Sequence, residues 1–145
     1  MDGGAGSAGA GAERRVLIVL AATAGGMFSV DPVTGEVVPA DPFDPVPGPK
    51  LNLPRVISTA ESGSTVVAVV DARPPMLVSH DAGMTWRESG RGLPPGKAVA
   101  VADWNPDRLV YAGRNRLYLS KDGGLFWTAL ALELPEIEAV AIREG

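Results

Sequence analysis

Residues 79–86 have the sequence SHDAGMTW, and residues 120–127 have the sequence SKDGGLFW. Both fit the pattern S-x-D-x-G-x-x-W, and the two copies begin 41 residues apart. In each copy an Asp/Gly turn precedes a Trp, a residue that proteins usually bury at least in part. A period of about 40 residues with a tight turn in each unit is typical of the four-stranded blades of a β-propeller.

Four β-rich runs surround each copy of the pattern. Turn residues such as Gly, Asp, Asn and Pro separate these runs, so each group predicts a four-stranded antiparallel meander. The runs around the first copy are 56–60, 65–71, 75–80 and 85–89. The runs around the second copy are 98–104, 108–113, 116–121 and 126–132.

The rest of the chain offers an incomplete unit. Three β-rich runs, at 16–22, 27–30 and 36–40, precede the first copy, and one further run at 136–142 follows the second copy. Twelve strands are thus expected, which is three blades of four. Since the last strand of a propeller commonly completes the first blade, we expect the final run to pair with the first unit.

The predicted organisation is one all-β domain behind a flexible Gly/Ala-rich lead-in at residues 1–14. The domain at residues 15–145 has blade 1 at about 15–40 plus 136–142, blade 2 at about 55–92 and blade 3 at about 97–132. A proline-rich loop at 39–54 separates the first two blades. We expect this loop to be a stiff exposed spacer, with a lid or partner-binding loop anchored by Phe43 as the alternative.

Three blades are too few to close a ring, because propellers typically have four to eight. Two copies of this chain would supply six blades. We therefore predict a homodimer that forms a six-bladed propeller and whose protomers exchange residues 136–142. The alternative is that the chain is a piece of a longer repeat protein.

Composition excludes several classes of function. The 145 residues carry a net charge of −4 and no long basic run, so nucleic acid is not an expected partner. The absence of cysteine excludes disulfides, thiol catalysis and thiolate metal sites, and His80 is the single histidine. We therefore expect no cofactor and no metal site.

One apolar stretch near the start has two interpretations. Residues 16–24, preceded by Arg14 and Arg15, resemble a short secretory signal, but the stretch is too short to span a bilayer. Residues 15–31 also align without gaps on residues 65–81, which favours a strand. A cytoplasmic protein without a membrane span is therefore favoured over a secreted one.

The two repeats resemble the Asp-box, or bacterial neuraminidase repeat, of sialidases, sortilin-type receptors, xyloglucanase-type glycosidases and photosystem-assembly propellers. The resemblance implies a propeller fold and is nearly silent on activity. The repeat residues have structural roles: the carboxylate accepts backbone bonds, Gly supplies the turn and Trp packs between sheets. These residues are Ser79, Asp81, Gly83, Trp86, Ser120, Asp122, Gly124 and Trp127.

In this family the repeat turns lie on the face away from the usual ligand site. The opposite face would carry the turns between second and third strands and the links between blades. Its candidate ligand-binding residues are Asp71, Arg73, Arg91, Arg114 and Asn115. Arginines at such positions could bind a carboxylate or phosphate through paired hydrogen bonds.

The leading hypothesis is a non-catalytic binding or scaffold module for an anionic ligand, a carbohydrate or a protein partner. The alternative is a glycoside hydrolase of sialidase or xyloglucanase type, truncated or completed by oligomerisation. A sialidase would carry an Arg-Ile-Pro motif, and residues 53–56, LPRV, do not match it. A glycosidase also needs two facing carboxylates, and the spacing of Asp71, Asp103 and Asp107 pairs none of them. A purely structural assembly factor is the third hypothesis.

Overall fold

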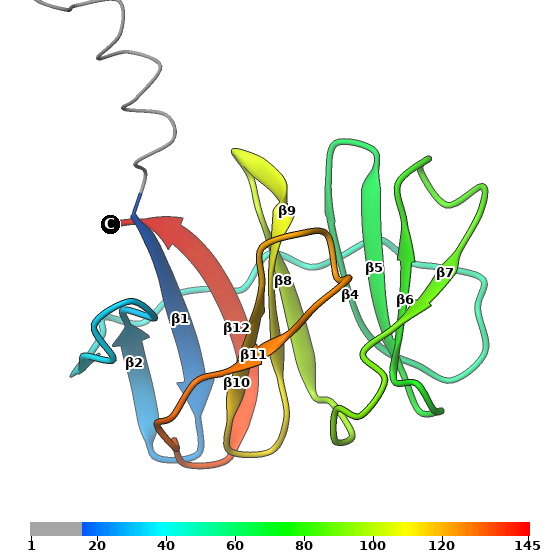
Figure 1. Ribbon diagram of the computed structural model, residues 1–145. Coiled ribbons are helices and arrows are strands. Elements are labelled where there is room, and N and C mark those ends of the chain that lie inside the picture. Colours follow the sequence, from blue (N-terminus) through cyan, green and yellow to red (C-terminus); the bar gives the residue numbers. More distant parts are fainter. Residues whose placement is uncertain (1–15) are drawn as a thin grey trace, which may run out of the picture.

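The computed structural model describes residues 16–145, so the predicted lead-in at 1–14 lies outside the described residues. The described chain forms twelve strands and no helix. The strands build three antiparallel sheets of four strands each (Figure 1). The predicted all-β class with four-stranded antiparallel blades is confirmed.

Blade 2 is a meander in the order β4-β5-β6-β7. Its second strand has the sequence TVVAVV, and all six residues are buried. β-Branched side chains suit such a strand because they pack closely on both faces of a pleated sheet. The strands are β4 Val56–Ser62, β5 Thr65–Val70, β6 Met76–Ser79 and β7 Arg87–Ser89.

Blade 3 repeats this meander, with β8 and β11 as its edge strands. Tyr111 is fully buried at its centre, and its ring lies edge-on to the rings of Tyr118 and Trp127, with centroids 6.0 Å away in both cases. The Tyr111 hydroxyl donates a hydrogen bond to the carbonyl of Pro94 over 2.5 Å. The strands are β8 Ala98–Ala102, β9 Asn105–Ala112, β10 Leu117–Ser120 and β11 Thr128–Ala129.

Blade 1 combines the two ends of the described chain. The last strand, β12, pairs antiparallel with β1 of the same chain, so that Val19 lies opposite Ile142. Blade 1 is therefore completed within one chain and not by the predicted exchange of residues 136–142 between protomers. The remaining strands follow in the order β2 and β3. The bounds are β1 Leu17–Thr23, β2 Gly26–Val30, β3 Val37–Pro39 and β12 Ile137–Glu144.

Two apolar clusters show that blade 3 lies between the other two blades. One cluster joins blade 1 to blade 3 and includes Val19 and Leu117. The other joins blade 2 to blade 3 and includes Val67 and Leu109. Each of these side chains is fully buried, which stabilises the fold by about 1.5–3 kcal/mol per residue. The three sheets therefore form an arc, with blades 1 and 2 at its two ends (Figure 1).

The proline-rich connection between blades 1 and 2 forms no strand and runs behind the three sheets before it enters β4 (Figure 1). Residues 45–51 line a cavity of about 530 Å³ together with parts of β4, β8 and β12. The Thr59 hydroxyl donates a hydrogen bond to the Pro49 carbonyl over 2.7 Å. A Cβ on Gly48 would lie 2.0 Å from the Thr59 carbonyl oxygen, so the two backbones are in close contact.

The prediction of an exposed spacer is therefore wrong for Gly48 and Pro49, which are half-buried in the middle of this segment. Phe43 is half-buried as well, so it is not the exposed anchor that the lid hypothesis required. Prolines lack the N–H that a sheet interior needs, but their carbonyls still accept hydrogen bonds. For that reason a proline-rich chain can cover the edge of β4 without joining the sheet.

Candidate functional site

The turns that connect the strands lie at two opposite ends of the strands, which are called the repeat end and the loop end below. At the repeat end, defined by residues 79–86 and 120–127, Ala82 donates its N–H to the carbonyl of Ser64 over 2.8 Å. At the loop end, defined by the turns 71–75 and 113–116 and the links 90–97 and 133–136, Leu134 donates its N–H to the carbonyl of Asn115 over 2.8 Å. The candidate ligand-binding residues therefore lie at the opposite end of the strands from the two repeat turns.

The first repeat turn, residues 79–86, is a self-contained hydrogen-bond network. The Ser79 hydroxyl donates to the Asp81 carboxylate over 2.7 Å and accepts the Gly83 N–H over 2.8 Å. Thr85 donates both its N–H, over 2.8 Å, and its hydroxyl, over 2.5 Å, to the same carboxylate. Serine and aspartate thus brace the turn with side-chain hydrogen bonds.

The second repeat turn, residues 120–127, has the same network. Ser120 donates to Asp122 over 2.8 Å and accepts the Gly124 N–H over 2.9 Å. Phe126 donates its N–H to Asp122 over 3.0 Å, but its side chain offers no hydroxyl. The matching bonds give the repeated serine and aspartate a structural role in both turns.

These bonds lower the pKa of both aspartates. The Thr85 hydroxyl and N–H, with the Ser79 hydroxyl, lower the pKa of Asp81 from 3.8 to about 2. The Phe126 N–H, followed by the Ser120 hydroxyl, lowers the pKa of Asp122. Each donor bonds better to the charged carboxylate than to the neutral acid. Both side chains are therefore anionic at neutral pH and serve the turns.

A cavity of about 650 Å³ opens at the loop end between the turn after β5 and the link before β8. Arg73 and Arg91 line it together with Asp71, so three of the predicted ligand-binding residues meet there. All three side chains are exposed. Apolar residues complete the lining, namely Ile57, Val70, Ala72, Pro74, Pro75, Leu93, Pro94 and Pro95.

The link that carries Arg91, residues 90–97, packs against Tyr111 of blade 3. Tyr111 binds the Pro94 carbonyl, and burial raises the pKa of the Tyr111 hydroxyl. A Cβ on Gly96 would lie 2.4 Å from the Tyr111 hydroxyl oxygen, so only glycine lets the link approach this ring. Arg91 is thus presented by a link that is fixed to the core of blade 3.

The other two predicted ligand-binding residues lie elsewhere at the loop end. The Asn115 side-chain amide donates to the Leu134 carbonyl over 2.9 Å, which makes it part of the link between blades 3 and 1. Arg114 precedes it, accepts the Ile137 N–H at its carbonyl and does not line the cavity of Arg73 and Arg91. The predicted arginine cluster is therefore split between two parts of the arc.

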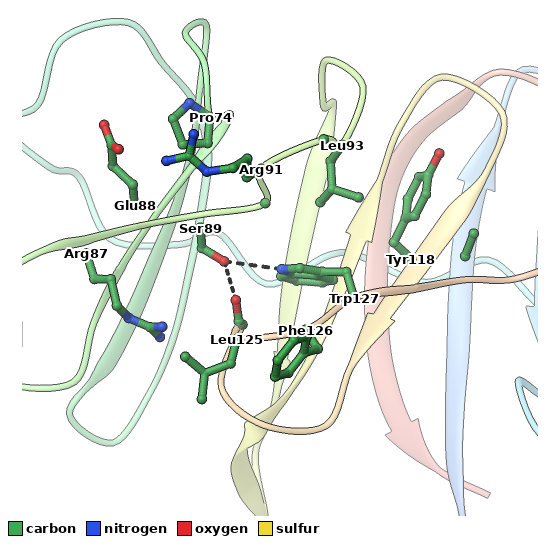
Figure 2. Close-up of a pocket in the computed structure, with 14 residues that line it drawn as sticks. Pro74, Arg87, Glu88, Ser89, Arg91, Leu93, Tyr118, Leu125, Phe126 and Trp127 are labelled. Atoms are coloured by element: carbon green, nitrogen blue, oxygen red, sulfur yellow. Dashed lines mark hydrogen bonds between the residues drawn. The ribbon is translucent and has the colours of Figure 1, made fainter.

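A second hollow, of about 560 Å³, lies along the seam between blades 2 and 3 (Figure 2). Ser89, at the end of β7, donates to the Gly124 carbonyl over 2.5 Å and accepts the Trp127 ring N–H over 3.2 Å. Arg87 donates to the Gly123 carbonyl over 3.0 Å. These bonds fasten the second repeat turn to the neighbouring blade.

Of the residues that line this seam, only Arg91 was among the candidate ligand-binding residues predicted from the sequence. Leu125 and Phe126 are 61% and 78% exposed at its edge, although both are large apolar side chains. Figure 2 shows Arg91 and Pro74 at one end of the hollow and Leu125 and Phe126 at the other. The signal was present in the variable positions of the repeat, where the second copy has LF and the first has MT.

The described residues contain no group of three or more His, Asp or Glu side chains that could hold a metal ion. No helix long and apolar enough to cross a membrane is found in residues 16–145. The two aspartates beside the β8–β9 turn do not face Asp71. The Asp103 carbonyl accepts a hydrogen bond from Ser62, at the end of β4, and the Asp107 carbonyl accepts one from Gly123, so both lie at the repeat end.

Comparisons with known proteins identify no family. No family model matches the sequence, and no curated protein matches it. Among solved structures, "YCF48 bound to D1 peptide" is similar, with 17% identity over 81% of this chain and a TM-score of 0.46. A GH74 enzyme of Niastella koreensis is similar over 83% of this chain, with 24% identity and a TM-score of 0.46. The chain spans 40% and 18% of the lengths of these two proteins.

Proposed function

We propose that the protein is a non-catalytic binding module of the β-propeller type, whose ligand is an anion or an acidic segment of a partner protein. The supporting observation is the convergence of Arg73 and Arg91 on one cavity with an apolar lining. Guanidinium groups bind carboxylates through paired hydrogen bonds, and the apolar lining offers contacts for the rest of the ligand. The relation of both repeats to the Asp-box family is part of this proposal and gives them a structural role.

The glycosidase alternative receives less support from the same cavity. Hydrolysis of a glycosidic bond normally uses two carboxylates about 5–10 Å apart across the sugar. Asp71 is the one carboxylate that lines the loop-end cavity in the described chain. We therefore expect no turnover of fluorogenic sialosides or xyloglucan oligosaccharides. Turnover that Asp71→Asn abolishes would favour the enzyme instead.

Calorimetric titration with a polyglutamate peptide tests the proposed site. We expect Arg73→Gln and Arg91→Gln each to weaken binding about tenfold, because each loses one charged pair. Arg143→Gln is the matched control, because Arg143 lies on β12 in blade 1, away from the loop-end cavity. Binding that all three variants weaken equally, or no binding to the unmodified protein, would contradict the proposal.

We further propose that two arcs associate as a homodimer with six blades. An arc of three sheets leaves blades 1 and 2 without a neighbouring blade on one side, and twofold symmetry would supply one to each. Sedimentation equilibrium measures this directly. The proposal predicts a mass of about twice the 15.0 kDa of the chain, and a mass of one chain at micromolar concentration contradicts it.

A further inference from the structure

The loop-end cavity and the seam hollow adjoin each other. Four residues contribute to the lining of both, namely Pro74, Arg91, Gly92 and Leu93. The groove, as used below, is the union of the two. It begins beside Arg73. It then passes Arg91 and follows the seam between blades 2 and 3 to Phe126 (Figure 2).

We propose that this groove binds an extended acidic peptide segment of a partner protein, with one apolar side chain of the peptide against Phe126. The inference rests on the proposed binding function and adds the class of partner and its direction along the groove. Acidic residues lie near Arg73 and Arg91, and the apolar residue lies at the other end. The seam is thus a recognition surface that extends from the loop end to the second repeat turn.

Charge favours an acidic occupant. Three arginines line the groove, namely Arg73, Arg87 and Arg91, and two carboxylates line it, those of Asp71 and Glu88. The groove therefore has an excess of positive charge, whereas the whole chain has a net charge of −4. Within the described chain, the guanidinium groups of Arg73 and Arg91 have neither an ion-pair nor a hydrogen-bond partner. Two unpaired cations beside a groove attract and orient an anionic segment.

The apolar end favours a peptide with a hydrophobic residue. Leu125 and Phe126 are 61% and 78% exposed, and the half-buried rings of Trp127 and Tyr118 lie in the same hollow. The Trp127 ring is fixed by its hydrogen bond to Ser89, so part of this surface is rigid before a partner binds. Aromatic residues in such places commonly dominate the free energy of protein association.

The strand beside the seam favours an extended conformation. Strand β7 is the last strand of blade 2 and pairs only with β6, so its other edge has no strand partner in the sheet. Residues 87–89 of this strand line the groove. An extended peptide can satisfy a free strand edge with its own backbone, which a nucleic acid or a sugar cannot do.

Fluorescence anisotropy with labelled peptides tests the inference. The first probe has about nine residues, or roughly 30 Å when extended, with one Phe among alternating Glu and Ser. A second probe replaces Phe by Ala, a third replaces every Glu by Gln, and a fourth is a single-stranded oligo-dT. We expect the Ala probe to bind about fivefold more weakly and the Gln probe about tenfold more weakly than the first probe.

The decisive variant is Phe126→Ser, because Phe126 is exposed and its loss should leave the fold intact. This variant should bind the Phe and Ala probes equally, whereas Val33→Ser, a control 87% exposed on the β2–β3 turn, should keep the preference for Phe. Leu125→Ser is measured alongside, because Leu125 borders the same hollow and its loss should reduce the preference only in part.

The outcomes separate this inference from the proposed function. If Phe126→Ser keeps the full preference for the Phe probe, the groove inference is overturned, while binding of acidic probes still supports the loop-end site. If no acidic probe binds the unmodified protein, both fail. Tighter binding of oligo-dT than of the acidic probes would overturn the choice of a peptide. Equal urea midpoints for all variants show that folding does not cause the changes.

Discussion

The two repeats share four of their eight residues and the same bracing hydrogen bonds of serine and aspartate, but they have different neighbours. The second repeat turn contacts blade 2, where Ser89 binds both the Gly124 carbonyl and the Trp127 ring. The first repeat turn lies on an end blade of the arc, and Met84 at its tip is 84% exposed. The repeated sequence thus determines the turn, whereas the position in the arc determines what the turn contacts.

This difference explains why one copy of the repeat borders the proposed recognition surface. In the described chain only the second copy closes a seam between two blades, and there Arg87 and the exposed Phe126 flank one hollow. The first copy borders a smaller hollow of about 310 Å³ formed by its own blade. Equivalent positions in a repeat protein can therefore have different functions when they face different neighbours.

Truncating the two tryptophans should reveal the largest difference. Trp127→Ala should lower the free energy of unfolding by about 3 kcal/mol, because the ring packs on Tyr111 and binds Ser89. Trp86 is also half-buried, but it makes no aromatic ring contact within the described chain, so Trp86→Ala should lose only about 1 kcal/mol. Urea unfolding measures both values. Equal losses would show that the two repeats are energetically equivalent.

Replacing a glycine should also destabilise the protein more in the second repeat turn than in the first. Gly83 and Gly124 have φ values of +90° and +92°, so alanine is strained at both positions. An added Cβ at Gly124 would also lie 3.0 Å from the Ser89 hydroxyl oxygen, whereas at Gly83 the nearest atom is 3.6 Å away. We expect Gly124→Ala to destabilise by about 2 kcal/mol and Gly83→Ala by about 1 kcal/mol.

Thermal unfolding of these two glycine variants provides the measurement. The larger fall in Tm should belong to Gly124→Ala. A larger fall for Gly83→Ala would mean that the first turn, despite its exposure, is the more constrained of the two.

Lowering the pH should have a smaller effect on the stability of the fold. Because folding lowers the pKa of Asp81 and of Asp122, both charged carboxylates stabilise the fold above the unfolded pKa of 3.8. Their contribution should be lost as the pH falls from about 4 through the lowered values, which is about 2 for Asp81. Carboxyl ¹³C titration follows each group separately.

The hydroxyl of Thr85 is a donor to Asp81 that has no counterpart at Asp122. Thr85→Val removes this donor while it keeps the N–H, so the pKa of Asp81 should rise and that of Asp122 should stay unchanged. An unchanged pKa of Asp81 would rule out the hydroxyl as the main cause.

Local patterns predicted the strands because each strand has its own signal. The run TVVAVV at β5 and the Asp/Gly turns at 81–83 and 122–124 act over a few residues, and those interactions can be recognised in the sequence. The path of the proline-rich segment had no such signal. It depends on the approach of Pro49 to Thr59, a contact between segments that no local pattern describes.

The candidate site was predictable only in part for the same reason. Its arginines were found because they lie on turns and links between strands, but the meeting of Arg73 and Arg91 at one cavity depends on the path of the link between blades 2 and 3. Arg114 and Asn115 lie on the corresponding turn of blade 3, yet there the amide binds the Leu134 carbonyl in the link to blade 1. Phe126 was overlooked because the repeat pattern treats its position as variable.

Amide chemical-shift mapping tests the central claim most directly. The acidic Phe-containing peptide is titrated into the uniformly ¹⁵N-labelled protein, and shifts are followed along the whole chain. The account predicts perturbed amides at residues 71–75, 87–93 and 124–127, with residues 79–86 of the first repeat turn unaffected. Shifts confined to residues 79–86, or equal shifts in both repeat turns, would contradict it.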